Sequence, residues 1–189
     1  QHAHAHAHAH AHQQPRPAKV AFDNVHFNYP SRPPQGVLQG LNLTVRPGEN
    51  VAVVGVSGSG KSTLLNMLQR LYDPNGGPRD DCGAVRLDGV DVRDVGVRAL
   101  RNRVGVVPQE PSLIEGSIYQ NITYGMDHPM EVPWAVVIAA AQKAGAAEFI
   151  MQLPFGYYTL LGAGGIFLSG GQAQRIAIAR ALVRNPEVL

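Results

Sequence analysis

The stretch Gly55-Val56-Ser57-Gly58-Ser59-Gly60-Lys61-Ser62 fits the pattern G-x-x-x-x-G-K-[ST] at every specified position. The apolar run Asn50 to Val54 precedes it and predicts a buried strand. The following residues, Lys61 to Leu71, carry leucines at helical spacing and predict a helix that packs on a sheet. A glycine-rich turn between a strand and a helix points successive backbone N–H groups at one anion, and the helix start adds its positive dipole end. The sequence therefore predicts a phosphate-binding loop at residues 55–62.

The side chains of this loop have distinct expected roles toward a nucleoside triphosphate. Lys61 supplies positive charge to the β- and γ-phosphates, the Ser62 hydroxyl is the expected Mg²⁺ ligand, and Thr63 adds a contact from the first helical turn. The expected backbone and hydroxyl donors are Gly55, Ser57, Gly58, Ser59 and Gly60. A glycine-rich turn without a ligand is the alternative, and the motif alone does not separate kinases, GTPases and transport ATPases.

Composition indicates one folded domain and argues against some partners. Of the 189 residues, 44% are hydrophobic and 16% are charged, which suits a packed core. Sixteen Lys and Arg against fourteen Asp and Glu leave a net charge of +2, too little to indicate nucleic acid as a partner. The single cysteine, Cys82, has no second cysteine for an internal disulfide, and no apolar run approaches the roughly 20 residues that cross a bilayer.

Residues 1–17 are set apart from the rest of the chain by an alternation of His and Ala from His2 to His12. Such a low-complexity tract builds no core, and it is either an affinity tag or a natural linker; in either case its imidazoles could hold a transition metal. We therefore place the folded domain at residues 18–189.

Period-two and helical patterns divide that domain into two parts. Lys19 to Phe27 and Leu41 to Val45 predict an antiparallel β region, and Ala84 to Leu87 and Val104 to Val107 predict further strands. Beyond these, helical patterns without a convincing strand occupy residues 117–123, 133–144, 146–152 and 171–184. The pattern indicates an α/β core that carries a mainly helical insertion.

The string Leu168-Ser169-Gly170-Gly171-Gln172-Ala173-Gln174-Arg175 resembles the signature motif of ATP-binding cassette (ABC) proteins. Serine and two glycines at a helix start form a second set of donors suited to a γ-phosphate. The resemblance implies that Ser169, Gly170, Gly171 and Gln172 act on the nucleotide of a partner domain. An ordinary serine N-cap accounts for Ser169 but not for the whole string.

Two further residues are similar to functional positions of the same family. Tyr29, in the loop Phe27 to Pro33, resembles the aromatic residue that stacks on adenine, with core packing as the alternative. Gln109 resembles the Q-loop glutamine, which implies a role at Mg²⁺ or the attacking water and in sensing the membrane domain. A plain loop glutamine is the alternative. Lys61 and Gln109 are thus the expected catalytic residues, and Ser62 and Gln109 the expected metal ligands.

The loop Tyr29 to Pro33, the run Gln109 to Pro111 and the segment Gly116 to Ile122 look most like those of subfamily-B, P-glycoprotein-like exporters. The resemblance implies a P-loop NTPase core with an N-terminal antiparallel β region and a helical subdomain at residues 113–175 that bears the signature. It also implies ATP and Mg²⁺ as cofactors, a second nucleotide-binding domain packed head to tail, transmembrane domains of the same transporter, and a location on the cytosolic or organelle-matrix face. A soluble ABC ATPase of the translation or DNA-repair type, or a non-catalytic nucleotide-binding fragment, is the alternative.

The sequence departs from the family pattern in three places. The turn Asn75 to Gly83 is longer than usual, and Ala163 stands where exporters commonly have Glu. The strand that bears the Walker B aspartate and the catalytic glutamate is expected to begin near Val188, while the sequence ends at Leu189. We therefore expect the intact protein to be an ATPase and the 189-residue chain to be inactive.

Overall fold

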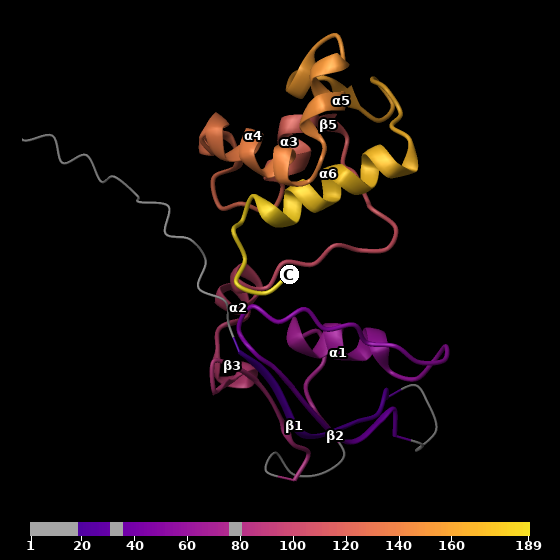
Figure 1. The fold of residues 1–189 in the computed structure, drawn as a ribbon, viewed down its shortest axis with the longest axis vertical. Coiled ribbons are helices and arrows are strands. Elements are labelled where there is room, and N and C mark those ends of the chain that lie inside the picture. Colours follow the sequence, from indigo (N-terminus) through magenta and orange to yellow (C-terminus); the bar gives the residue numbers. More distant parts are fainter. Residues whose placement is uncertain (1–18, 31–35, 76–80) are drawn as a thin grey trace, which may run out of the picture.

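The computed structural model describes residues 19–30, 36–75 and 81–189. The His and Ala tract, the Ser31 to Pro33 part of the aromatic loop and most of the lengthened turn lie outside the described residues. Figure 1 shows two lobes, one built on a sheet and one helical, which the chain connects twice. No helix among the described residues is long and apolar enough to cross a membrane.

The sheet lobe contains an antiparallel sheet of order β2-β1-β3-β4. Its strands are β1 (Val20–Phe27), β2 (Leu38–Val45), β3 (Ala84–Leu87) and β4 (Val90–Asp91). Along β1, Val20, Phe22, Val25 and Phe27 are buried on one face, with register shifts around Asn24, whose φ is 48°. The helices α1 (Lys61–Leu68) and α2 (Val97–Arg103), with a 3-10 turn at Val92–Asp94, complete this core.

The helical lobe has a separate hydrophobic core. It contains α3 (Ile118–Thr123), α4 (Trp134–Lys143), α5 (Ala147–Gln152), α6 (Gly170–Leu182) and 3-10 turns at Pro129–Glu131 and Gly156–Tyr158. Ile118, Ile122, Val137, Ile150 and Ile176 are fully buried there and hold α6 against α3 and α4. A two-stranded sheet of β5 (Gly116–Ser117) and β6 (Leu160–Leu161) closes one side.

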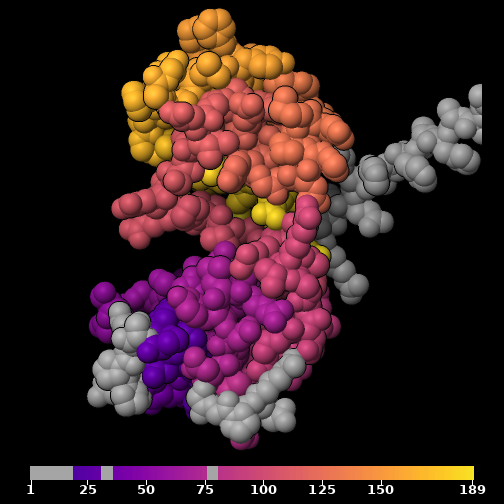
Figure 2. Space-filling view, turned by 180° about the vertical axis from the view of Figure 1, so that it is seen from behind, coloured from indigo at the N-terminus to yellow at the C-terminus, as the bar shows by residue number. Residues whose placement is uncertain are grey.

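The two chain crossings between the lobes lie side by side. Val104 forms a parallel bridge with Val188, and the Gly105 amide donates to the Val188 carbonyl oxygen at 2.8 Å. Arg103 donates to both Glu187 and Asp88, at 2.5 Å each, and so joins the second crossing to the end of β3. Figure 2 shows the two lobes from behind with a constriction between them.

The structure confirms the strands Lys19 to Phe27, Leu41 to Val45 and Ala84 to Leu87, and the mainly helical insertion. The prediction of a buried strand at Asn50 to Val54 is wrong: this segment has no regular secondary structure, and Val53 and Val54 are 46% and 87% exposed. A strand requires a hydrogen-bonded neighbour, and none of the described residues pairs with this segment. For the same reason the strand expected at Val104 to Val107 is reduced to the single bridge at Val104.

Other sequence predictions were incomplete. The helix expected to run to Leu71 ends at Leu68, because Arg70 takes a left-handed backbone conformation with φ 53°. Leu64 and Leu68 of the expected apolar stripe are buried, whereas Leu65 and Leu71 are 55% and 51% exposed. Neither α2 nor the short strand β6 was predicted, and β6 lies where only helices were expected.

Candidate functional site

The loop at residues 55–62 is an exposed turn that leads directly into α1. Gly58 and Gly60 have φ values of 83° and 92°, in the left-handed region that favours glycine. Gly60 is the buried N-cap of α1, and a Cβ there would lie 3.0 Å from the Leu38 side chain and 3.2 Å from the Val37 side chain. A Cβ at Gly55 would lie 2.6 Å from the Ser59 Oγ, so a larger residue there would require the Ser59 side chain to move. The loop therefore presents its backbone to solvent at a helix N-terminus.

The Lys61 side chain folds back over this loop. Its Nζ donates to the carbonyl oxygens of Gly55 and Val56 at 2.9 and 2.8 Å. Within the described residues, no carboxylate forms an ion pair with this ammonium. The positive charge thus lies at the loop mouth with neutral partners, which an anion of higher charge density can replace. Ser62 follows at the exposed start of α1.

Tyr29 connects the end of β1 to the same helix. Its hydroxyl lies 3.0 Å from the Thr63 Oγ1, and Thr63 is 3% exposed. The Tyr29 ring also packs edge to face on Phe27, with centroids 4.8 Å apart. The ring is half-buried. The structure therefore brings Tyr29 and the phosphate loop together, although 34 residues separate Tyr29 from Thr63 in the chain.

The Ser169 to Gln172 motif lies in the other lobe, at the start of α6. The Ser169 Oγ accepts from the Gln172 amide at 3.3 Å, and the Gln172 Oε1 accepts from the Ser169 amide at 2.9 Å. This is a capping box, and Ser169, Gly170 and Gly171 are exposed around it. The structure does not bring this motif to the phosphate loop of the same chain, since the two belong to different lobes (Figure 1).

Gln109 lies exposed on the first crossing between the lobes. Its neighbour Pro108 accepts a hydrogen bond at 3.2 Å from Gln174 of α6. Farther along, Arg180 of α6 donates to the Ser112 carbonyl oxygen at 2.8 Å and to the Asn121 carbonyl oxygen at 2.8 Å. Burial lowers the pKa of the Arg180 guanidinium. The segment that carries Gln109 is therefore attached to α6 at both ends.

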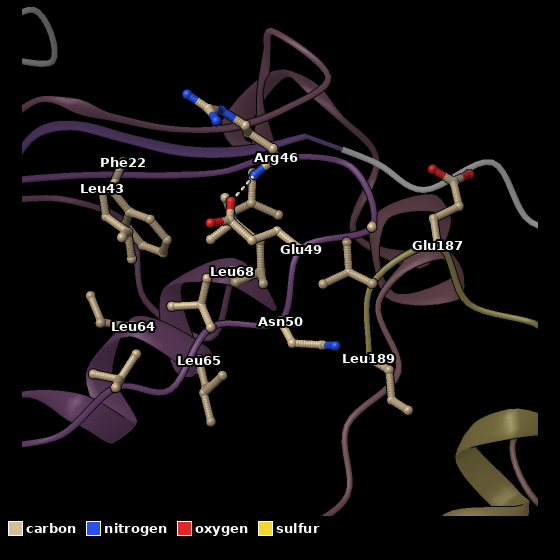
Figure 3. Close-up of a pocket in the computed structure, with 16 residues that line it drawn as sticks. Phe22, Leu43, Arg46, Glu49, Asn50, Leu64, Leu65, Leu68, Glu187 and Leu189 are labelled. Atoms are coloured by element: carbon tan, nitrogen blue, oxygen red, sulfur yellow. Dashed lines mark hydrogen bonds between the residues drawn. The ribbon is translucent and has the colours of Figure 1, made fainter.

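A cavity of about 410 Å³ lies between α1 and the sheet and is distinct from the loop at residues 55–62. Figure 3 shows Phe22 and Leu43 of the sheet facing Leu64 and Leu68 of α1 across it, with Leu189 at its far side. Glu49 accepts from the Arg46 amide at 2.8 Å at the rim. The lining of this cavity is mostly aliphatic and includes none of residues 55–63, so the cavity is not the predicted phosphate site.

Sequence and fold comparisons decide between the nucleotide-binding families. The family model described as "ABC transporter" matches residues 38–189, which include both the phosphate loop and the serine-glycine motif of α6. The chain belongs to the ABC transporter family. It carries the nucleotide-binding part of that family, and the predicted α/β P-loop fold with a helical insertion is confirmed.

The relatives of this ABC chain are subfamily-B exporters, as the sequence indicated. The human "ATP-binding cassette sub-family B member 5" is 51% identical over 170 residues, which are 90% of this chain and 13% of that protein. The mouse mitochondrial sub-family B member 10 is 50% identical, over 90% of this chain and 23% of its own length. A solved bacterial Atm1-family ABC exporter with ATP bound aligns with a TM-score of 0.77 and 44% identity, covering 92% of this chain and 29% of its own.

Sequence reasoning missed two asparagines whose side chains bind the backbone of neighbouring segments. Asn121 is fully buried and bonds the Ile114 backbone through both side-chain atoms, at 2.9 and 3.0 Å. Asn75 bonds the Asn28 backbone next to Tyr29 in the same manner. The sequence does not indicate which backbone groups these two side-chain amides bind, because their partners are set by the fold.

Proposed function

We propose that residues 18–189 form the ATP-binding domain of a membrane exporter, with residues 113–175 as its helical subdomain. In the intact protein this domain couples ATP binding and hydrolysis to transport. The observation that carries the proposal is the phosphate loop: the Lys61 ammonium lies over exposed backbone at the start of α1, on two carbonyl partners that phosphate oxygens can replace.

The residues of the loop fit a nucleoside triphosphate. Gly58 has nothing within 4 Å of its side-chain position, so the backbone is open to close approach by phosphate oxygens. Lys61 then binds the β- and γ-phosphates, and the loop from Gly55 to Gly60 donates its N–H groups. The face of Tyr29 supplies the stacking surface for the base, and Thr63 lies beneath its hydroxyl.

The proposed Mg²⁺ ligands are the Ser62 hydroxyl and the Gln109 amide oxygen. Both side chains are exposed, and the described residues contain no group of three or more His, Cys, Asp or Glu that would form a separate metal centre. Mg²⁺ is usually held by one or two protein ligands together with substrate phosphates, which agrees with this sparse set. Bound there, Mg²⁺ neutralises charge that develops on the phosphates.

The serine-glycine motif of α6 supports a second copy of the domain as partner. Ser169, Gly170 and Gly171 are exposed and lie in a different lobe from the phosphate loop of their own chain. A head-to-tail pair would bring the motif of one copy to the nucleotide on the other. The transporter names of the relatives support transmembrane domains as further partners, with this domain on the cytosolic or matrix face.

The test of the phosphate loop is the variant Lys61→Ala in the full-length protein, with Lys143→Ala as the control. Lys143 is an exposed lysine at the end of α4, in the other lobe. We expect Lys61→Ala to weaken binding of a fluorescent ATP analogue at least tenfold, because the main charge partner of the phosphates is lost. Equal affinities for the two variants would show that the phosphate-loop assignment is wrong.

We also propose that the 189-residue chain binds ATP without hydrolysing it at a useful rate. Hydrolysis requires a held metal ion and a positioned water, and the proposed site residues Lys61, Ser62 and Gln109 include no carboxylate that would act as a water-activating base. Phosphate release by the purified chain is compared with release by the full-length protein. Equal turnover that Lys61→Ala abolishes in both would contradict this proposal.

A further inference from the structure

The segment that follows α1 holds the backbone on which Tyr29 is placed. The Asn28 amide donates to the Asn75 Oδ1 at 2.7 Å, and the Asn75 Nδ2 donates to the Asn28 carbonyl oxygen at 2.9 Å. The Asn75 amide donates in addition to the His26 carbonyl oxygen at 3.0 Å. Asn75 is thus joined to the end of β1 by one backbone and two side-chain hydrogen bonds. Three hydrogen bonds fix the chain immediately before Tyr29.

The same segment also contacts the Tyr29 ring. The Tyr72 ring lies 5.1 Å from the Tyr29 ring, at an interplanar angle of 86°, and 5.5 Å from the Phe27 ring. Phe27 is 2% exposed and belongs to the core of the sheet lobe, while Tyr72 is 40% exposed. Edge-to-face contacts of this kind restrict the orientation of a ring, because its quadrupole favours one arrangement over others. Tyr29 is therefore restrained on the backbone by Asn75 and on the ring by Phe27 and Tyr72.

The exposure of Tyr72 bears on its role. A tyrosine that only fills the core is expected to be buried, and Tyr72 leaves a large part of its surface in solvent beside the ring proposed to bind the base. Arg70 directs the chain to this place: its left-handed backbone ends α1, and its guanidinium donates to the Val95 carbonyl oxygen at 3.0 Å. The position of residues 71–75 is thus set by contacts outside the helix.

We propose that Tyr72 and Asn75 are positioning residues for the base-stacking face of Tyr29. They hold the ring in its binding orientation before the nucleotide arrives, so that less side-chain freedom is lost on binding. The inference rests on the proposed function, in which Tyr29 stacks on the base of ATP. An edge-to-face aromatic contact is worth about three- to tenfold in affinity when it preorganises a site.

The experiment measures two dissociation constants on the full-length protein, one for Mg-ATP and one for Mg-tripolyphosphate, which has the phosphates but no base. Tyr72→Ala and Asn75→Ala are expected to weaken Mg-ATP binding by about three- to tenfold and to leave Mg-tripolyphosphate binding unchanged. Tyr72→Phe keeps the ring and should bind both as the unmodified protein does. Tyr158→Ala, which removes a 68% exposed tyrosine from the helical lobe, is the matched control.

Each outcome separates this inference from the proposed function. If Tyr72→Ala weakened the binding of Mg-ATP and of Mg-tripolyphosphate equally, the substitution would have damaged the whole lobe, and the positioning role would be overturned. Tyr72→Leu, which keeps apolar volume without a ring, repeats the test if Tyr72→Ala does not fold. Base-dependent loss in Tyr29→Ala but not in Tyr72→Leu or Asn75→Ala would overturn the inference alone. No base-dependent loss in Tyr29→Ala would instead refute the stacking role of Tyr29, with Lys61→Ala still reporting on the phosphate loop.

Discussion

Ser169 has two roles that substitution can separate: it caps α6, and it is proposed to contact the nucleotide of a partner domain. The capping bond from the Gln172 amide to the Ser169 Oγ is 3.3 Å long, near the upper limit for an N–H···O hydrogen bond. Ser169→Ala removes it and should cost about 1 kcal/mol of unfolding free energy. For a chain of this size, that loss lowers the melting temperature by about 2–4 °C.

Ser169→Asp should have opposite effects on stability and function. An aspartate caps the same amide, and its charge is favourable by about 0.3–1 kcal/mol at a helix N-terminus, so the melting temperature should equal or exceed that of the unmodified protein. Toward a γ-phosphate about 5 Å away, the same charge is repulsive by about 1–3 kcal/mol at an effective dielectric constant between 20 and 80. ATP-dependent activity should therefore fall by about fivefold to 150-fold.

The assay pairs thermal unfolding with phosphate release by the full-length protein. Ser117→Ala is the matched control, because Ser117 and Gln120 form an equivalent capping box at α3, with bonds of 3.1 and 2.8 Å. It should lower stability as Ser169→Ala does. A Ser169→Asp protein that is stable and releases phosphate at the unmodified rate would refute the nucleotide role and leave Ser169 as a cap only.

Two further predictions concern Tyr29 and Asn121. Tyr29→Ala should weaken the binding of ATP and of GTP alike by about 1–3 kcal/mol, and Tyr29→Trp should bind both normally, because a ring face stacks on any base. Titration with both nucleotides measures this, and a loss of affinity confined to one nucleotide would contradict it. Asn121→Ala should lower the unfolding free energy by about 3–5 kcal/mol, because several hydrogen bonds of the buried side chain are lost. The groups left without this partner are the Ile114 amide, the Ile114 and Ser117 carbonyl oxygens and the Arg180 guanidinium. Denaturant unfolding tests the second, and a change below about 1 kcal/mol would show that water replaces these bonds.

Sequence reasoning agrees with the structure where the local geometry of a motif is set by neighbours in the chain. The phosphate loop depends on left-handed glycines at 58 and 60 and on a lysine at the helix start, all within one short segment. The N-cap that the sequence offered as an alternative role for Ser169 is present in the structure, where Gln172 completes it as a capping box. The role of these residues toward ATP stays a prediction, but their local geometry is as the sequence indicates.

Sequence reasoning failed where an element depends on a distant partner. Asn50 to Val54 has the composition of a buried strand and is exposed, because pairing requires a second strand that no described segment supplies. The end of α1 was misplaced because the Arg70 guanidinium bonds carbonyl oxygens of Val92 and Val95, more than 20 residues away. Intrinsic helix propensity is a weak signal that such tertiary contacts override.

The two motifs, the family resemblance and the helical character of the insertion could be predicted from the amino-acid sequence, since each depends on the spacing of a few residues. The placement of the signature in a different lobe from the phosphate loop, and the contacts of Asn75 with the Asn28 backbone and of Tyr72 with the Tyr29 ring, appear only in the folded chain. The physical reason is that backbone geometry and helix caps are local, whereas ring contacts and amide pairs between residues 47 positions apart form only when the whole lobe has packed.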